Sequence, residues 1–319
     1  MKAIRCSQLG LPDSLALENI DAPVAGAGEV LITVRAAGVN FPDVLIIQGK
    51  YQIKPALPFT PGYEVAGIVT AVGDDVTHLK VGDHAVAQTA LGGFAEVVKV
   101  PAQLCFAMPS SIPFVDAAAF PIAYGTSYYA LKDRGRLQPG ETLLVLGASG
   151  GVGLAAVQLG KIMGARVIAC ASSDEKLAAC KAHGADEGVN YAREDLREAI
   201  KRLCAGKGVD VVLDPVGGTY AEPCVRGMAW KGRYLVVGFA AGEIPRIPLN
   251  LALLKGCDIV GVACIEPAGS PDNFRQLIAW VADGTLKPVI SATYPLARTA
   301  DALKDMMNRK VQGKAVIVP

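Results

Sequence analysis

The stretch Leu143–Gly160, LLVLGASGGVGLAAVQLG, decides the fold of this chain. It begins as an apolar run of strand length, passes through a cluster of glycines, and continues with small and apolar residues at helical spacing. The sequence therefore predicts a strand, a tight turn and a helix. Glycines belong at such a turn because the pyrophosphate of a dinucleotide must approach backbone N–H groups at the helix N-terminus. We expect Ser149, Gly150, Gly151 and Val152 to form this binding turn.

The glycine pattern matches the dinucleotide-binding fingerprint G-x-G-x-x-G only in part. Ala148 stands where the first glycine of that motif is expected, whereas Gly150 and Gly153 supply the other two. A lone match of this kind is weak, but a strand before it and a helix after it are the context that the motif needs. Pattern and context together predict dinucleotide binding.

The composition indicates a globular chain with room for more than one core. At 319 residues it is long enough for two domains. A net charge of +1 gives no field that would recruit nucleic acid or an anionic membrane. The eight cysteines are scattered without a C-x-x-C pair, which is typical of reduced thiols in the cytosol. We therefore expect a cytoplasmic protein without a nucleic-acid or membrane partner.

The texture of the sequence changes twice along the chain. Residues 1–122 are β-rich and punctuated by Pro and Gly, which predicts a barrel-like domain. Residues 123–262 alternate predicted strands and helices, which specifies a doubly wound parallel sheet and the α/β class. Residues 263–319 change again, and we expect this tail to rejoin the first domain. The clearest predicted strands are 30–36, 65–72 and 96–100 in the first part and 166–169, 209–213 and 234–237 in the second.

The end of the predicted strand 166–169 indicates the cofactor. An Asp or Glu there, about 20 residues after the glycines, would bind the ribose 2′-hydroxyl of NAD. This chain has Ala171, Ser172 and Ser173 instead. Small hydroxyl residues with a nearby lysine, here Lys176, accept a 2′-phosphate through charge-assisted hydrogen bonds. Lys176 as an ordinary solvated residue is the alternative, but the whole pattern predicts NADPH.

The helix after that strand has a recognisable start and stop. Ser172 and Glu175 fit a capping box, so the helix is expected over Asp174–His183. Gly184 follows its last turn, as is common at helix C-termini.

Several stretches together resemble one known family. They include AAGVNFPDVLIIQGKY (36–51), PFTPGYEVAGIVTAVG (58–73), GASGGVG (147–153), VDVVLDPVGG (209–218) and GKAVIVP (313–319). The chain resembles the medium-chain dehydrogenase/reductase superfamily and, within it, the zinc-free, zeta-crystallin-like quinone oxidoreductases. The resemblance implies a Rossmann domain and a GroES-like, β-barrel-type catalytic domain built from both chain ends, with the active-site cleft between them. It also implies a homodimer joined through the Rossmann sheets.

Residues for a catalytic zinc are missing from this chain. Zinc alcohol dehydrogenases of the superfamily have Cys and His at the positions that look here like Asn40 and Tyr63. Neither of these side chains is a zinc ligand, and Glu64 alone would hold the metal poorly. No cysteine lies between His84 and Phe94, where a structural zinc lobe would fall. We expect no metal, so nothing obvious would stabilise an alkoxide from a plain alcohol.

The resemblance places the acceptor chemistry on Asn40 and Tyr51. The Asn40 amide is expected to donate to a substrate carbonyl oxygen, although asparagine is also a common turn residue. Tyr51 is expected to line the substrate cleft. Asp43 lies in the same segment, and capping of the adjacent helix is the alternative to a role in this acceptor chemistry. For Glu64 a structural role is expected.

The resemblance also supplies the remaining cofactor residues. Lys176 and Tyr191 match the phosphate-binding positions of the family, and Lys314 is expected to reach the cofactor from the returning tail. For the nicotinamide contacts, packing and turn formation are the alternatives. These contacts are expected from Thr126, Val216, Gly217, Phe239 and Ala240.

Three functional hypotheses follow. The leading one is an NADPH-dependent reductase that transfers hydride to a quinone without zinc. An enone or enoyl-thioester reductase shares every motif, and residues 263–274, which should help to form the cleft, are not diagnostic. A non-catalytic NADPH-binding protein, like the lens crystallins of the family, is the third, and the presence of Asn40 and Tyr51 argues against it.

Overall fold

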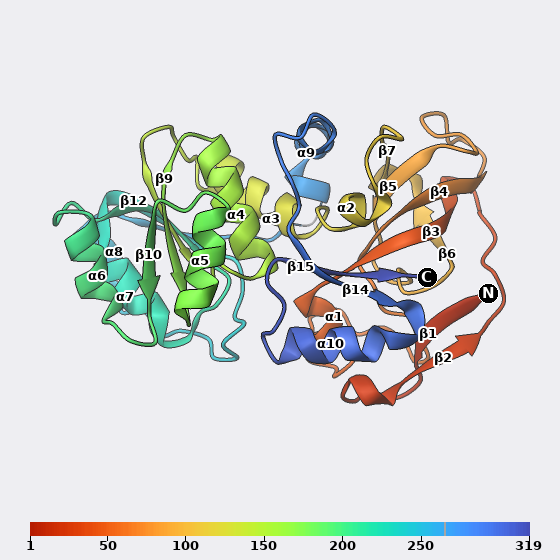
Figure 1. The fold of residues 1–319 in the computed structure, drawn as a ribbon, viewed down its shortest axis with the longest axis horizontal. Coiled ribbons are helices and arrows are strands. Elements are labelled where there is room, and N and C mark those ends of the chain that lie inside the picture. Colours follow the sequence, from red (N-terminus) through yellow and green to blue (C-terminus); the bar gives the residue numbers. More distant parts are fainter. Residues whose placement is uncertain (265) are drawn as a thin grey trace. The chain divides into compact units, whose positions relative to one another are not determined.

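The computed structural model describes residues 1–264 and 266–319 (Figure 1). Their contacts form two compact units. The first unit contains Met1–Gly125 together with Ser270–Pro319, and the second contains Thr126–Gly269. The chain therefore enters the second unit once and returns to the first.

The second unit is built on a parallel sheet, which confirms the predicted α/β class. The strands lie in the order β10-β9-β8-β11-β12-β13, and every neighbouring pair is parallel. This is the doubly wound order of dinucleotide-binding folds, with the topological switch between β8 and β11. The strands are β8 (Thr142–Leu146), β9 (Arg166–Ala171), β10 (Glu187–Asn190), β11 (Val209–Asp214), β12 (Met228–Val236) and β13 (Asp258–Gly261).

Helices cover both faces of this sheet, which is why its central strands are apolar throughout. In Figure 1, α4 and α5 lie on one face, and α6, α7 and α8 lie on the other. Leu144, Ile168 and Val212 share a buried cluster with Ile200 of α6 and Leu251 of α8. The helices are α3 (Ala123–Tyr129, which enters from the first unit), α4 (Gly151–Ile162), α5 (Asp174–Ala182), α6 (Leu196–Leu203), α7 (Ala221–Arg226) and α8 (Asn250–Lys255), with short helical turns η3 (Ala130–Arg134), η4 (Gly218–Tyr220) and η5 (Pro267–Gly269).

The first unit is built on a mostly antiparallel sheet in the order β14-β15-β3-β4-β5-β7, with β6 paired to β3. The tail strand β15 pairs with β3, which brings Ala315 opposite Val39. The predicted strands 30–36 and 65–72 lie within β3 and β4. The strands are β1 (Lys2–Cys6), β2 (Leu15–Asn19), β3 (Glu29–Val39), β4 (Glu64–Val72), β5 (His84–Gln88), β6 (Val97–Pro101), β7 (Cys105–Ala107), β14 (Ile290–Pro295) and β15 (Lys314–Val318).

The core of the first unit joins residues from both ends of the chain. Val30, Ile32 and Val65 of the central strands share one buried cluster with Leu303 and Ile317 of the tail. Alternation along β3 places its apolar side chains in this core. The helices of the unit are α1 (Phe41–Ile46), α2 (Phe114–Ala118), α9 (Pro271–Ala282) and α10 (Thr299–Met307), with short turns η1 (Pro12–Ser14), η2 (Ala102–Leu104) and η6 (Leu296–Arg298).

The long uncharged run Thr142–Gly160 does not form a single apolar helix, because it is divided between β8 and α4. Among the described helices, none has the length and apolar character that a membrane crossing would need.

Candidate functional site

The glycine turn between β8 and α4 has the geometry of a phosphate cradle. Gly150 is the N-cap of α4, whose first-turn N–H groups have no acceptor within the helix. A Cβ on Gly153 would lie 2.2 Å from the Gly147 carbonyl oxygen, so only glycine lets the helix approach the turn this closely. Among the described residues, a Cβ on Gly150 would find one neighbour within 4 Å, the same oxygen at 3.4 Å. The residues present therefore fit a pyrophosphate.

Helix α3 is fixed to the start of α4. The buried hydroxyl of Ser127 donates a hydrogen bond to the carbonyl of Val152 at 2.8 Å. Thr126, the predicted nicotinamide contact, is the preceding residue and is half-buried. Ser149 of the turn is buried.

The residues predicted to bind the 2′-phosphate gather where β9 ends. The Lys176 ammonium donates to Ser172 Oγ at 3.4 Å, and the Lys176 backbone N–H donates to Ser173 Oγ at 3.3 Å. Ser173 is therefore the N-cap of α5, and the predicted capping box of Ser172 and Glu175 is wrong by one residue. The reason is that Ser173 has the extended backbone of an N-cap, so the Ser172 hydroxyl is left to face Lys176.

Tyr191 directly follows the neighbouring strand β10 and lies next to this group. Its backbone N–H donates to the Ala171 carbonyl at 3.2 Å, and its ring lies 4.4 Å from that of Tyr220. Two carboxylates, Asp174 and Glu175, lie in the first turn of α5, and Asp174 is already bound. Arg193 Nη1 donates to it at 2.5 Å and Asn190 Nδ2 at 2.6 Å, so its negative charge is partly neutralised.

The loops after β11 and β12 bring four predicted nicotinamide contacts together. The Ala240 N–H donates to the Pro215 carbonyl at 3.1 Å, next to Val216. Gly217 has a φ of +69°, and a Cβ there would lie 2.9 Å from the Phe239 ring. Only glycine suits this position, where the backbone turns sharply against an aromatic ring.

Lys314, Asn40 and Glu64 form a buried network in the first unit. The Lys314 ammonium donates to Asn40 Oδ1 and to Glu64 Oε1, both at 2.6 Å, and to the Val39 carbonyl at 2.9 Å. Asn40 Nδ2 also donates to Glu64 Oε1 at 2.6 Å. Lys314 is only 2% exposed and Glu64 is fully buried. The ammonium thus orients the Asn40 amide, with its oxygen toward Lys314 and its nitrogen toward Glu64.

Asp43, Tyr51 and Tyr63 lie beside this network. Asp43 accepts hydrogen bonds from the backbone N–H of Asn40 at 2.8 Å and of Gly62 at 3.0 Å, so it serves the start of α1. Burial raises the pKa of Asp43 to about 7. Tyr51 packs edge-on against Tyr63 at 5.9 Å between ring centres. The buried Tyr63 hydroxyl has no hydrogen-bond partner among the described residues, and burial raises its pKa, so it stays protonated.

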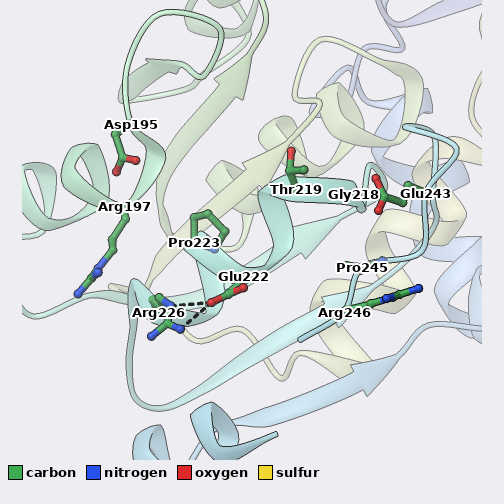
Figure 2. A pocket seen from close by; sticks show the side chains of 10 residues that line it. All are labelled: Asp195, Arg197, Gly218, Thr219, Glu222, Pro223, Arg226, Glu243, Pro245 and Arg246. Carbon is green, nitrogen blue, oxygen red and sulfur yellow. Dashed lines mark hydrogen bonds and ion pairs between the residues drawn. The ribbon is translucent and has the colours of Figure 1, made fainter. Parts of the chain in front are cut away.

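A hollow of about 390 Å³ lies beside the loop after β11 (Figure 2). Its wall includes Gly218 and Thr219, and Arg226 is held there by Glu222 at 2.6 Å. Three arginines and three acidic residues line it, so it favours neither sign of charge. None of the predicted cofactor residues is part of this wall. The hollow is lined by Asp195, Arg197, Gly218, Thr219, Glu222, Pro223, Arg226, Glu243, Pro245 and Arg246.

Comparisons with known proteins show the family of this chain. Residues 26–110 match the alcohol dehydrogenase GroES-like domain, and residues 151–283 match the zinc-binding dehydrogenase family. The chain is 39% identical to a quinone oxidoreductase-like protein 2 homolog of Nematostella vectensis, over 99% of this chain and 88% of that protein. It is 35% identical to the quinone oxidoreductase of Rattus norvegicus, over 100% and 98%.

The chain belongs to the quinone oxidoreductase family. This membership confirms the predicted superfamily, the GroES-like fold of the first unit and an oxidoreductase activity. A solved structure of Escherichia coli quinone oxidoreductase complexed with NADPH has a TM-score of 0.93 and 30% identity, over the full length of both chains. A structure described as an NAD-dependent alcohol dehydrogenase has the same TM-score, 31% identity and full coverage of both chains. Among the solved relatives, one is thus described with NADPH and another as NAD-dependent.

Sequence reasoning did not find three features of these sites. The ion pair between Lys314 and Glu64 has no local signal, because the residues are 250 positions apart. The partners of Asp174 are also invisible in a linear pattern. The third feature is Asp214 at the end of β11, which accepts hydrogen bonds from the backbone N–H groups of Val216 and Gly217. The sequence did carry a signal for it, because an aspartate that ends an apolar strand before a turn commonly accepts hydrogen bonds from the following backbone.

Proposed function

We propose that this protein is an NADPH-dependent reductase that transfers hydride to a quinone without using zinc. The single observation that carries the proposal is the arrangement of Lys176 and Ser172 at the end of β9, 3.4 Å apart, with Ala171 where a NAD site has a carboxylate. A 2′-phosphate would receive hydrogen bonds there from an ammonium and hydroxyls. The Escherichia coli relative solved with NADPH supports the same cofactor.

The second unit supplies the residues that would hold the cofactor. The first-turn N–H groups of α4, including those of Gly151 and Val152, would bind the pyrophosphate, with Ser149 and Gly150 in the turn that precedes them. Ser172, Ser173, Lys176 and Tyr191 would hold the phosphorylated ribose. The bound cofactor supplies the hydride, and the protein supplies position and electrostatics. The nicotinamide end would contact Thr126, Val216, Gly217, Phe239 and Ala240.

Asn40 would orient the acceptor. One N–H of its amide is engaged by Glu64, and the other has only a long contact of 3.4 Å to the Gly38 carbonyl. This second N–H is the one that would donate to a carbonyl oxygen of the acceptor, with Tyr51 beside it. Lys314 would thereby act through Asn40, because its three N–H groups donate to Val39, Asn40 and Glu64. Its contact with the cofactor, which the family resemblance implies, stays a prediction.

The same network supports a mechanism without zinc. Zinc in proteins is bound by thiolate, imidazole or carboxylate. Here the Lys314 ammonium lies 2.6 Å from both Asn40 Oδ1 and Glu64 Oε1, so the carboxylate already has a cationic partner. Polarisation of the acceptor would come from hydrogen-bond donors instead.

A substrate panel tests the reaction. NADPH oxidation is measured with quinones, with α,β-unsaturated ketones and with enoyl thioesters, each at matched concentration. We expect the highest kcat/KM with quinones. A higher value with an enone or a thioester would replace quinone by that acceptor, and no oxidation with any of them would favour a binding protein.

Lys176→Glu tests the cofactor. It places a carboxylate beside the phosphate site, so we expect KM for NADPH to rise at least about tenfold and KM for NADH to change little. Lys181→Glu, in the last turn of the same helix, is the matched control and should change neither constant. Equal effects of Lys176→Glu on both cofactors would show that the phosphate binds elsewhere.

We also propose a homodimer formed through the second unit. Strand β13 is the last strand of its sheet, and no other described strand pairs with its outer side. Large apolar side chains are exposed near it, among them Trp230, Leu253 and Leu254. Such a patch beside an open edge suits a second copy of the same chain.

A further inference from the structure

Asp214 ends strand β11 and is buried beneath the loop that follows. Its Oδ1 accepts hydrogen bonds from the backbone N–H groups of Val216 at 2.7 Å and Gly217 at 2.8 Å. Its Oδ2 accepts one from the hydroxyl of Tyr234, which is buried on the neighbouring strand β12. Burial raises the pKa of Asp214, and the three donors act in the opposite direction by stabilising the carboxylate.

Backbone hydrogen bonds join this loop to the loop after β12. The two loops contain the predicted nicotinamide contacts Val216, Gly217, Phe239 and Ala240, and Figure 2 shows Gly218 and Glu243, one from each loop, close together. The loop after β11 starts at Asp214, and the loop after β12 is hydrogen-bonded to the Asp214 carbonyl, so the two loops form one unit rather than two independent segments. The bonds run from the N–H groups of Val237 and Gly238 to the Asp214 carbonyl (2.9 and 3.2 Å), from Ala240 to Pro215 (3.1 Å), from Ala241 to Val216 (2.9 Å) and from Gly218 to Glu243 (3.0 Å).

The position of this pair of loops fixes two side chains. A Cβ on Gly147 of the nucleotide turn would lie 2.7 Å from Val216 Cγ2, so the Val216 side chain rests on that turn. A Cβ on Gly217 would meet the Phe239 ring at 2.9 Å, so the ring rests on Gly217. A shift of the backbone at Val216 and Gly217 would therefore move both side chains.

We propose that Asp214 and Tyr234 are positioning residues for the nicotinamide end of the cofactor, acting through Val216, Gly217 and Phe239. The proposal rests on the proposed function, from which it takes NADPH as the ligand. The Asp214 carboxylate accepts hydrogen bonds from the N–H groups of Val216 and Gly217. These bonds hold the loop in the conformation that presents its side chains to the nicotinamide ring. Tyr234 holds the carboxylate in turn. Neither residue contacts the cofactor itself.

The test compares two ligands that differ in the nicotinamide. NADPH contains it, whereas 2′,5′-ADP has only the phosphorylated adenosine end. For Tyr234→Phe and Asp214→Asn, we expect Kd for NADPH to rise about tenfold, with loss of the fluorescence change of the bound nicotinamide. Kd for 2′,5′-ADP should stay within about twofold, because its site lies at β9.

Asp210→Asn is the matched control. Asp210 lies at the other end of β11 and also accepts a backbone hydrogen bond, from the Thr142 N–H at 2.8 Å. This variant should bind both ligands like the wild type. If Asp214→Asn does not fold, Tyr234→Phe still decides the matter, because it removes one hydroxyl and keeps the ring.

Two results would overturn the proposal: equal weakening of both ligands in folded Tyr234→Phe, or no change in either. The proposed function fails in a different way. A wild-type protein that binds NADPH but reduces no quinone would contradict that function while leaving the comparison of the two ligands valid.

Discussion

Lys314 shows how one residue can tie together distant parts of the chain. Its ammonium is buried with the Glu64 carboxylate, the Asn40 amide and a backbone carbonyl. A buried charge without its partner is costly, whereas removing both charges of a pair costs far less. The side chain of Asn40 is held in one orientation by these two charges, as its proposed role as a donor to a substrate oxygen would require.

We predict that Lys314→Met destabilises the protein by about 3–5 kcal/mol, because it leaves Glu64 buried and unpaired. The double variant Lys314→Met/Glu64→Gln should be more stable than the single variant. Urea denaturation measures both free energies of unfolding. If the single variant were as stable as the double variant, burial of Glu64 without Lys314 would carry no cost in the free energy of unfolding.

Asp43 gives a pH dependence of known sign. Burial raises its pKa from the ordinary 3.8 to about 7. Between these values the folded protein keeps a proton that the unfolded chain has lost, so stability falls as pH rises, by about 1.4 kcal/mol per pH unit from this group. We expect Asp43→Asn to lack this component.

The check is the difference in the free energy of unfolding between the wild type and Asp43→Asn, followed from about pH 4 to pH 7. This difference should change steadily across the range, since every other titrating group is shared. Parallel curves would mean that Asp43 titrates at its ordinary pKa in the folded protein.

At the scale of elements, helix α5 depends on a cap that differs from the expected one. Ser173, not Ser172, accepts the hydrogen bond from the Lys176 N–H. The two adjacent serines therefore have separate tasks. Ser173 stabilises the helix start, and Ser172 faces the Lys176 ammonium.

We predict that Ser173→Ala lowers the free energy of unfolding by about 0.5–2 kcal/mol, the usual cost of losing an N-cap. Ser172→Ala should leave stability nearly unchanged and raise KM for NADPH more than KM for NADH. Thermal or urea denaturation with steady-state kinetics separates the two effects. If Ser172→Ala were the more destabilising change, the cap would be misassigned.

At the scale of the whole molecule, the open edge of the second unit's sheet predicts the oligomeric state. Leu254 is 68% exposed on α8, which packs on β12 near the edge strand β13. A carboxylate there would be buried without a partner in a dimer but harmless in a monomer.

We therefore expect Leu254→Glu to convert the protein from a dimer to a monomer in sedimentation velocity. Leu17→Glu makes the same change at an exposed position of β2 in the first unit and should leave the dimer intact. A wild-type protein that sediments as a monomer, or a Leu254→Glu dimer, would contradict the proposed interface.

The sequence alone determined the local architecture of the second unit. An apolar strand, glycines and a helix follow one another in Leu143–Gly160, and each depends on neighbours within a few positions. The segment from Ala171 to Lys176 also depends only on nearby positions, and its residue types predict a phosphate site. The exact cap was missed because two adjacent serines offer equivalent side chains, and only the backbone angles at Ser173 choose between them.

Only the tertiary structure decided which distant residues meet. Pairing of β15 with β3 brings Lys314 to Asn40 and Glu64, and pairing of β11 with β12 places Tyr234 near Asp214. Hydrophobic periodicity defines which face of an element is buried, but it does not name the partner across that face. A buried charge becomes tolerable only through such a partner, so the chemistry of these sites is a property of the folded chain.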